Sequence, residues 1–553
     1  MLPPHSRICL LIYSLSCEFF TGAEQDISIY IKHYEGLSYN RELIKQHKER
    51  IRREVHLNNQ ELHLDFDAFR REFHLRLKPD ADGFTGDFKV HSKDEIQMVD
   101  LSHIYSGILE DDKGSSCQGS VLEGQFEGSI TTGNGTFYVE PISRYTTTNS
   151  DYHSIIYHED DVDDVPLRGA RAGFCGAERL KNLVENHQEI PVSRSKRKVN
   201  QAKTSCLLHI HADHRFYKRF GSIEAVVAQI GSYMKAVNDI YNNAVFEGID
   251  LVNFKVKFLT VTTEEDPSSP LSNTHLGPEK LLSLFSEMNW NDYCLSYLLT
   301  DRDFSGVLGL AWTGQIDNWG GICSKMIPKA GRNYSHNTGL VTLQNFGYYL
   351  SSKLVHLTFA HELGHSLGAP HDEGSDCGDL KITGGKGRFL MFPHATYKFE
   401  ENSDKFSQCS LNHMSDVLTE KKDKCFVVAE QPICGNRIVE DGEECDVGHN
   451  ESDPCCFSSK EHLGTECTLK PGKQCSPSQG LCCSSNCVFK KADVMCEKQS
   501  ECRTQNLCTG TSAKCPKPPP KPDMTKCSNG TRVCFSGVCP RWQSYLYTLS
   551  EIH

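Results

Sequence analysis

HELGHSLGAPHD, at residues 361–372, is the stretch that decides the fold of this chain. On a helix, His361 and His365 lie one turn apart on the same face, with Glu362 beside them. Gly368 can adopt the backbone angles that end a helix and bring His371 round as a third nitrogen ligand. Three imidazoles with an open fourth position are typical of a catalytic zinc site and not of a closed structural one.

The residue types of this stretch suit the cleavage of peptide bonds by water. Zinc lowers the pKa of a bound water from about 15.7 to about 7. Glu362 is too short to be a fourth ligand from its position, so we expect it to take the water's proton and pass it to the leaving amine. The motif therefore predicts a zinc endopeptidase that forms no covalent intermediate.

The sequence around the motif supports a buried helix. A bare HExxH also occurs by chance on polar surface turns. Here Val355, Phe359 and Leu363 recur every four residues on the side opposite the histidines. Met391, twenty residues after His371, stands where the metzincin proteases carry a methionine beneath their three histidines.

The residues before the motif alternate between strand and helix patterns. CLLHIHADHRFY predicts a strand that leads into a helix, residues 222–241 a helix, and LVNFKVKFLTV a strand. A further helix and strand over residues 281–299 and the strand GVLGLAW complete an α/β sandwich, with GVLGLAW as an edge for an extended substrate. We interpret the histidines in this region, at 209, 211 and 214, as a surface face and not as a second metal site.

Composition and charge exclude some classes of function. The chain has 553 residues and a formal net charge of −13, which argues against nucleic acid as the main partner. Of its 26 cysteines, sixteen fall between Cys434 and Cys539. The even number in each block predicts disulfides within domains, formed in an oxidising compartment.

The N-terminus predicts entry into the secretory pathway. Residues 1–23 contain a short apolar run followed by small residues, as in a signal peptide; the alternative is a buried N-terminal strand. No later stretch is long and apolar enough for a transmembrane helix, so we expect a secreted, extracellular product. Sequons at Asn134, Asn333, Asn450 and Asn529 are in keeping with secretion.

Residues 24–197 predict a β-rich prodomain, because short runs alternate between apolar and polar residues. The segment ends in Arg194-Ser195-Lys196-Arg197, the form that furin-type convertases recognise. Its place, between the cysteine-poor block and the metalloprotease domain expected at 198–430, distinguishes it from Arg52-Arg53 and Lys421-Lys422, which we interpret as solvated surface. We therefore predict cleavage after Arg197.

Residues 431–539 predict a domain with little regular structure. Many turn residues and little periodicity mean that the segment cannot bury enough apolar surface, so disulfides must hold its shape. Residues 540–553 form a C-terminal tail.

Several segments together resemble the ADAM (reprolysin) branch of the metzincins, of the kuzbanian or α-secretase type. They are HELGHSLGAPHD, HYEGLSYN, GTFYVEP, DRDFSGVLGLAW, GGICSK and LKPGKQCSPSQG. The resemblance implies a zinc endopeptidase that sheds the ectodomains of cell-surface proteins, followed by a disintegrin-like domain at 431–539. It also implies disulfides that join Cys206 to Cys294, Cys323 to Cys425 and Cys377 to Cys409.

The resemblance further implies calcium at the start of the disintegrin-like domain. The residues in question are Asn436, Glu440, Glu443 and Asp446. Carboxylate and amide oxygens are suitable calcium ligands. The alternative is that these acids are surface residues.

Three departures from the family pattern matter. The chain stops shortly after Cys539, where the relatives continue into a membrane span. Val447 replaces a cysteine of the family, and a second cysteine is missing just before Cys455, which suggests one deleted disulfide. Cys175 matches the prodomain cysteine that caps zinc only by location, so a cysteine switch and a disulfide with Cys117 are both open.

Two hypotheses from different classes follow. The first is a secreted zymogen that a furin-type convertase activates, with protein substrates at the cell surface or in the extracellular space. The second is a disintegrin-like binding module, or a soluble decoy of a membrane sheddase. The intact zinc motif and the lack of an RGD sequence favour the first.

Overall fold

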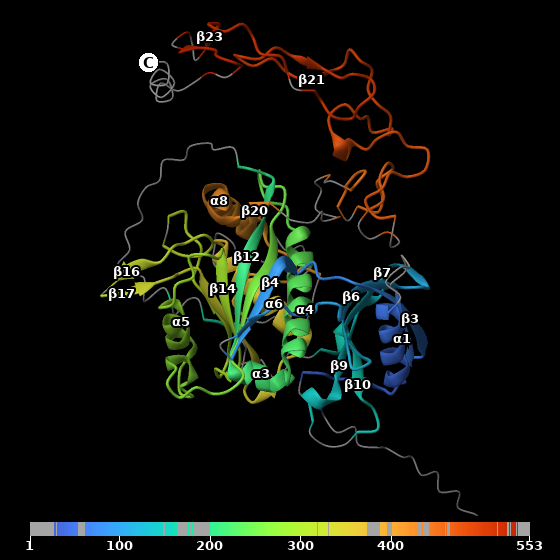
Figure 1. The fold of residues 1–553 in the computed structure, drawn as a ribbon, viewed down its shortest axis with the longest axis vertical. Coiled ribbons are helices and arrows are strands. Elements are labelled where there is room, and N and C mark those ends of the chain that lie inside the picture. The colour runs from blue at the N-terminus through green and yellow to red at the C-terminus, as the bar shows by residue number, and fades with distance from the viewer. Residues whose placement is uncertain are drawn as a thin grey trace, which may run out of the picture.

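The computed structural model contains three parts, which follow one another along the chain (Figure 1). It describes residues 27–28, 30–53, 61–93, 95–146, 150–162, 174–176, 180, 199–317, 319–329, 331–372, 387–394, 401–428, 434, 439, 442–448, 450–458, 461, 465–516, 518–527, 530, 532–537 and 539. The expected signal peptide, the convertase site at Arg194, Lys196 and Arg197, and Cys377 lie outside these residues.

The first part is an antiparallel sheet with strand order β1-β10-β9-β8-β7-β6-β3-β2. In β2 every second residue is buried, as the alternating sequence predicts, and helix α1 packs against this strand. The sheet closes over a core that includes Phe73 and Phe126. Its elements are β1 (Glu35–Leu37), α1 (Arg41–Arg53), β2 (Leu62–Ala68), β3 (Arg71–Pro79), β6 (Ile104–Leu109), β7 (Asp112–Leu122), β8 (Gln125–Thr132), β9 (Gly135–Pro141), η1 (Ile142–Arg144), β10 (Ser154–His158) and η2 (Glu159–Asp161).

The second part is the predicted α/β sandwich, built on the strand order β15-β18-β14-β12-β13. Helices α4 and α6 cover one face of this sheet and α5 covers the other, so neighbouring residues such as Leu298 and Leu299 point into different cores. The elements are β12 (Lys203–Ala212), α3 (His214–Phe220), α4 (Ile223–Asn242), β13 (Asn253–Val261), η5 (Pro270–Ser272), α5 (Pro278–Ser286), β14 (Leu295–Asp303), β15 (Val307–Ala311), β16 (Ile327–Lys329), β17 (Arg332–Tyr334), β18 (Thr338–Asn345), β19 (Tyr348–Tyr349), α6 (Ser352–Ser366), α8 (Gln408–Cys425) and β20 (Val427–Val428).

Strands from the N-terminal region extend this second sheet at both edges. Strand β11 (Phe174–Cys175) pairs in parallel with β15, and β4 (Phe84–Ser92) pairs in parallel with β13. Strand β5 (Glu95–Gln97) then pairs with β4. Figure 1 shows β4, in blue, among the green strands of the sandwich and apart from the N-terminal sheet.

Two surface interpretations are wrong. His209 and His211 are 2% and 8% exposed, because parallel strands inside an α/β sandwich are covered on both faces. His209 donates or accepts hydrogen bonds with Ser296 and Thr260 and stacks on Trp290, which identifies it as a core histidine and not as a metal ligand.

The lysine pair at the end of α8 is also buried and not solvated. Lys421 and Lys422 are 1% and 0% exposed. Lys421 Nζ donates to the carbonyl oxygen of Gly320 and to Ser324 Oγ, and burial lowers the pKa of Lys421 to about 7. The lysine thereby joins α8 to the loop that follows β15.

The third part has little regular structure, as expected. Its regular elements among the described residues are η6 (Pro477–Gln479) and the strand pairs β21 (Met495–Glu497) with β22 (Asn506–Leu507) and β23 (Lys526–Cys527) with β24 (Arg532–Val533). Eight disulfides pair all sixteen cysteines between Cys434 and Cys539. The absence of a leftover thiol here fits the loss of one complete disulfide at Val447.

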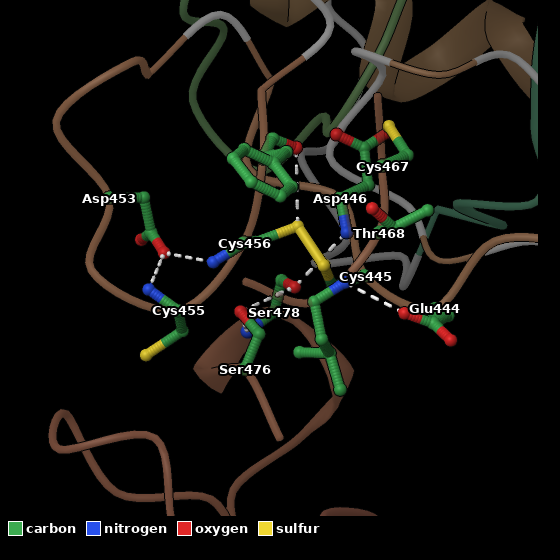
Figure 2. Close-up of a disulfide and its surroundings, with 12 residues drawn as sticks. Glu444, Cys445, Asp446, Asp453, Cys455, Cys456, Cys467, Thr468, Ser476 and Ser478 are labelled. Carbon is green, nitrogen blue, oxygen red and sulfur yellow. Dashed lines mark hydrogen bonds between the residues drawn. A yellow bond between two sulfur atoms is a disulfide. The ribbon is translucent and has the colours of Figure 1, made fainter. Parts of the chain in front are cut away.

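A disulfide and a pair of hydrogen bonds join the segment around Val447 to the chain that follows it. Cys445 bonds to Cys456, and Asp453 Oδ1 accepts hydrogen bonds from the backbone N–H groups of Cys455 and Cys456 (Figure 2). In the catalytic part, the expected disulfides Cys206–Cys294 and Cys323–Cys425 are both present. Among the described residues, no helix is both long enough and apolar enough to cross a lipid bilayer.

Candidate active site

Helix α6 positions the first half of the site. Val355, Phe359 and Leu363 are fully buried on its core side, as their spacing predicts. The helix ends after Ser366, and Gly368 then has a φ of 110°, a backbone conformation that glycine adopts without strain. This turn brings His371 back toward the helix.

The three predicted histidines converge. The ring nitrogen atoms of His361, His365 and His371 that could bind a metal lie within 4.8 Å of one another, and His365 Nε2 is 3.1 Å from His371 Nε2. His361 Nδ1 donates to the carbonyl oxygen of Leu390 at 2.7 Å, and His365 Nδ1 donates to that of Ala369 at 2.8 Å. With the proton on Nδ1, each Nε2 atom carries the lone pair that can bind a metal.

The chemistry of this donor set fits zinc. Burial lowers the pKa of His361 to about 4, so its imidazole is neutral at physiological pH. His361 Nε2 is buried and makes no hydrogen bond within the protein. Neutral imidazole nitrogens that converge in this way are the ligands that zinc prefers in catalytic sites.

Glu362 lies beside the histidines and is fully buried. Burial raises the pKa of this carboxyl to about 8, and the nearby thiol of Cys175 offsets part of that rise. The carboxylate packs against β15 at Gly309, where a Cβ atom would stand 2.5 Å from Glu362 Oε1. Glycine at position 309 therefore permits the close approach of the strand to the acid.

Met391 and Asp372 pack behind the histidines. The Met391 side chain is fully buried, and its sulfur would be 2.5 Å from a Cβ atom on Gly364, between the two helical histidines. Asp372 N donates to the Met391 carbonyl oxygen, and Asp372 Oδ1 accepts hydrogen bonds from Ser407 and Ser410 at the start of α8. The last residue of the motif thus ties the methionine turn to α8.

Cys175 lies in the same cleft. Its sulfur belongs to the group of four candidate ligand atoms, with the three histidine nitrogens, that lie within 4.8 Å of one another. The Cys175 N–H donates to the Pro393 carbonyl oxygen, and the next residue, Gly176, donates to that of Gly309. Cys117 is a buried thiol in β7 and does not pair with Cys175, so the disulfide alternative is wrong.

A mostly apolar pocket opens beside Glu362. It is lined by residues of β15, α6 and the segment around the methionine turn, among them Leu308, Leu354, Leu357 and Phe392. Such a pocket can take an apolar side chain of a bound peptide.

The expected calcium residues are only partly described. Asn436 and Glu440 lie outside the described residues. Asp446 is buried, and its Oδ1 accepts a hydrogen bond from the Gly448 N–H. Glu443 lies near the Cys434–Cys467 disulfide.

Some contacts of the site were missed by sequence reasoning. Backbone carbonyls such as those of Leu390 and Ala369 carry no sequence signal, because any residue supplies one. Ser407 and Ser410 also lacked a recognisable pattern. Gly309 did leave a signal, since a glycine inside a strand often marks a place where another group approaches closely.

Comparison with known proteins agrees with this geometry. Residues 202–407 match the family model of metallo-peptidase family M12, and residues 440–518 match the disintegrin model. The chain is 43% identical over 563 residues to the disintegrin and metalloproteinase domain-containing protein 10 of Bos taurus. The matched region covers 96% of this chain and 75% of the relative. The identity to the human protein is 43% over 575 residues, with 99% of this chain and 77% of the relative covered. The identity to the Caenorhabditis elegans homolog is 30% over 632 residues, with 97% of this chain and 68% of the relative covered. The chain thus belongs to the disintegrin and metalloproteinase (ADAM) family, of the kuzbanian type, and is a zinc metalloendopeptidase.

Proposed function

We propose that the chain is the zymogen of a secreted zinc endopeptidase that cleaves extracellular or cell-surface proteins, as ectodomain sheddases do. The observation that supports this most is the convergence of His361, His365, His371 and the buried Glu362 in one cleft. In this proposal the three histidines hold zinc, and Met391 supports them from below.

Different parts of the cleft have different roles in hydrolysis. When bound, zinc supplies Lewis acidity toward water and the scissile carbonyl. Glu362 takes a proton from the attacking water and passes it to the leaving amine. An extended substrate pairs with the outer edge of β15, the edge that β11 covers here, and the apolar pocket takes one of its side chains.

Cys175 holds the zymogen inactive in this proposal. Its thiol lies among the histidine nitrogens and beside Glu362, where it would act as a fourth ligand and exclude water. Cleavage by a furin-type convertase at Arg194-Ser195-Lys196-Arg197 separates the prodomain from the protease. The signal at residues 1–23 delivers the chain to the secretory pathway.

The test is the turnover of quenched peptides by the processed protein, with Glu362→Ala as the matched variant. We expect Glu362→Ala to lower turnover by about 100-fold to 10,000-fold, the usual contribution of a general base. Activity that survives this substitution, or that survives strong zinc chelation, would overturn the assignment. Neo-termini on cell-surface proteins, compared between wild type and Glu362→Ala, then identify the natural substrates.

Calcium at the start of the disintegrin region is a separate part of the proposal. It would involve Asn436, Glu440, Glu443 and Asp446, whose oxygens suit calcium. We expect calcium to raise the melting temperature of the wild type but not of Asp446→Ala. An equal rise in both would contradict a site at these residues.

A further inference from the structure

The N-terminal region holds the protease at two edges of the catalytic sheet, and only one edge is near the histidines. Strand β11 covers β15 at the active-site edge, while β4 covers β13 at the opposite edge. Four inter-strand steps separate β15 from β13 in the order of the sheet. At roughly 4.8 Å per step, the two strands that receive these attachments stand about 19 Å apart.

The attachment at β13 combines backbone pairing with buried apolar contacts. Val256 N donates to the Gly83 carbonyl oxygen at 2.9 Å, and the parallel pairing then continues as far as Thr260 opposite His91. Phe84, Phe88 and Val90 of β4 are at most 5% exposed and belong to the hydrophobic core of the catalytic part. These three side chains therefore complete a core that the protease alone leaves open.

The close fit extends to helix α4. A Cβ atom on Gly231 of this helix would lie 3.2 Å from the Phe84 ring and 3.1 Å from Ile104. In the other direction, a Cβ atom on Gly83 would lie 3.0 Å from Met234 Cβ. The segment before β4 and the helix are thus shaped to one another on both sides.

Charges on the two sides of this attachment are complementary. Lys255 and Lys257 on β13 face Asp82 and Asp87 at 2.9 Å and 3.6 Å, and Lys235 on α4 lies 3.8 Å from Asp80. Burial would raise the pKa of Asp80, but Lys235 and the Asp82 N–H outweigh it and hold this pKa below its usual value.

We propose that β13, with Lys235, Lys255 and Lys257, is a docking edge of the protease, and that residues 80–97 of the prodomain are its occupant. This second attachment, which does not involve the zinc site, keeps the prodomain bound after the chain is cut. The inference rests on the proposed cleavage after Arg197.

Two attachments on the same prodomain bind the protease more tightly than either attachment alone. Once one of them is formed, the other re-forms within the same complex at a high effective concentration. Loss of the thiol contact at Cys175 alone therefore leaves the cut prodomain in place, and full release requires the β13 edge to open as well.

The experiment measures how fast the cut prodomain leaves. Full-length protein carrying Glu362→Ala, which prevents self-digestion, is cleaved with furin, and a new N-terminus at Lys198 verifies the cut. If that terminus does not appear, the activation proposal fails, and the docking edge is tested on the same chain cut at a protease site inserted after Arg197. Dissociation of the labelled prodomain is then followed at nanomolar concentration.

The variant Asp80→Lys/Asp82→Lys/Asp87→Lys should weaken the cut complex at least tenfold. Combining it with Cys175→Ser should weaken the complex more than either change alone. The matched control reverses three acids on the outer part of the N-terminal sheet, Asp65, Asp67 and Asp111, which are exposed. A triple variant that stays within twofold of this control would overturn the proposal.

Exchanging the charges of one ion pair distinguishes the loss of a specific contact from misfolding of the variant. Asp82→Lys alone should weaken the complex, and adding Lys255→Asp should restore its affinity to within threefold of the parent. If the exchange gives no recovery, the pair does not carry the attachment and the proposal is wrong.

Discussion

At the scale of single residues, the site depends on glycines that leave room for functional side chains as much as on the candidate metal ligands. Gly309 lets β15 pass against Glu362, and Gly364 leaves room for the Met391 sulfur. In both places a Cβ atom would come within 2.5 Å of a functional side chain. The geometry of the acid and of the histidines is therefore set partly by glycines.

The substitution Gly309→Ala tests this point. The new methyl group must push the Glu362 carboxylate out of place, because backbone on β15 cannot retreat while the sheet stays paired. We expect turnover to fall about 100-fold, as for a misplaced catalytic group, with zinc content unchanged. Peptide turnover and metal analysis of the processed protein measure both quantities.

Gly277→Ala serves as its control, because the nearest atom to the new Cβ there is 3.5 Å away. It should keep turnover close to that of the wild type. Equal losses in the two variants would show that Gly309 acts through general stability.

Cys175 allows a second test at this scale. In the uncut zymogen, Cys175→Ala removes the thiol from among the histidine nitrogens and from Glu362. We expect partial peptidase activity to appear without cleavage, because β11 still covers the edge of β15. The measurement is turnover of a short quenched peptide by zymogen that carries Arg197→Ala to prevent processing; Cys117→Ala should remain inactive. No activity in Cys175→Ala would mean that the strand alone blocks the cleft.

At the scale of elements, helix α6, which carries His361 and His365, receives its N-terminal cap from the N-terminal sheet. Ser351 makes no side-chain cap on α6, but Glu140 Oε1 of β9 accepts a hydrogen bond from the Ser352 N–H at 3.3 Å. Glu140 also accepts hydrogen bonds from Tyr145 and Tyr157. A carboxylate at this end of a helix satisfies a free N–H and favours the helix dipole.

Removal of this carboxylate should destabilise the uncut chain. We expect Glu140→Ala to lower the free energy of unfolding of the zymogen by about 1–3 kcal/mol, because buried donors lose their acceptor. Thermal melts of the uncut wild type and of the uncut variant measure this. Glu140→Gln keeps an acceptor oxygen and should lose less; a loss in Glu140→Gln as large as in Glu140→Ala would refute the capping role.

The element scale also shows how far sequence reasoning reaches. The strands β12 to β15 and the helices α3 to α6 were predicted from their periods of two or of 3.6 residues, but the central strand β18 was not. The position of β4 in the catalytic sheet was not predicted. The alternation in Phe84–Ser92 indicates that a strand forms, but it does not indicate which sheet the strand joins. The burial of His209 and of Lys421 was missed for a similar reason: exposure depends on the layers that pack above a residue, which local sequence does not record.

At the scale of the whole molecule, the parts are stabilised by different means. The catalytic part has a large apolar core, which β4 extends. The C-terminal part has small clusters made mainly of cysteines, and disulfides replace the missing core.

Mild reduction of the disulfides should therefore unfold the C-terminal part before the catalytic part. We expect the backbone amides of residues 465–539 to lose their protection from hydrogen exchange first, while β12, β13 and β14 stay protected. Hydrogen exchange with mass spectrometry at increasing reductant measures the order. Loss of protection in both parts at the same reductant concentration would contradict this division.

The proposed hydrolysis depends on one zinc ion that His361, His365 and His371 bind beside Glu362. An anomalous-scattering map of crystals of the processed protein, collected on both sides of the zinc edge, tests it most directly. We predict one strong peak between the three imidazole rings, and the loss of this peak in His365→Ala. Crystals grown with zinc that show no peak there, with the three rings turned apart, would contradict it.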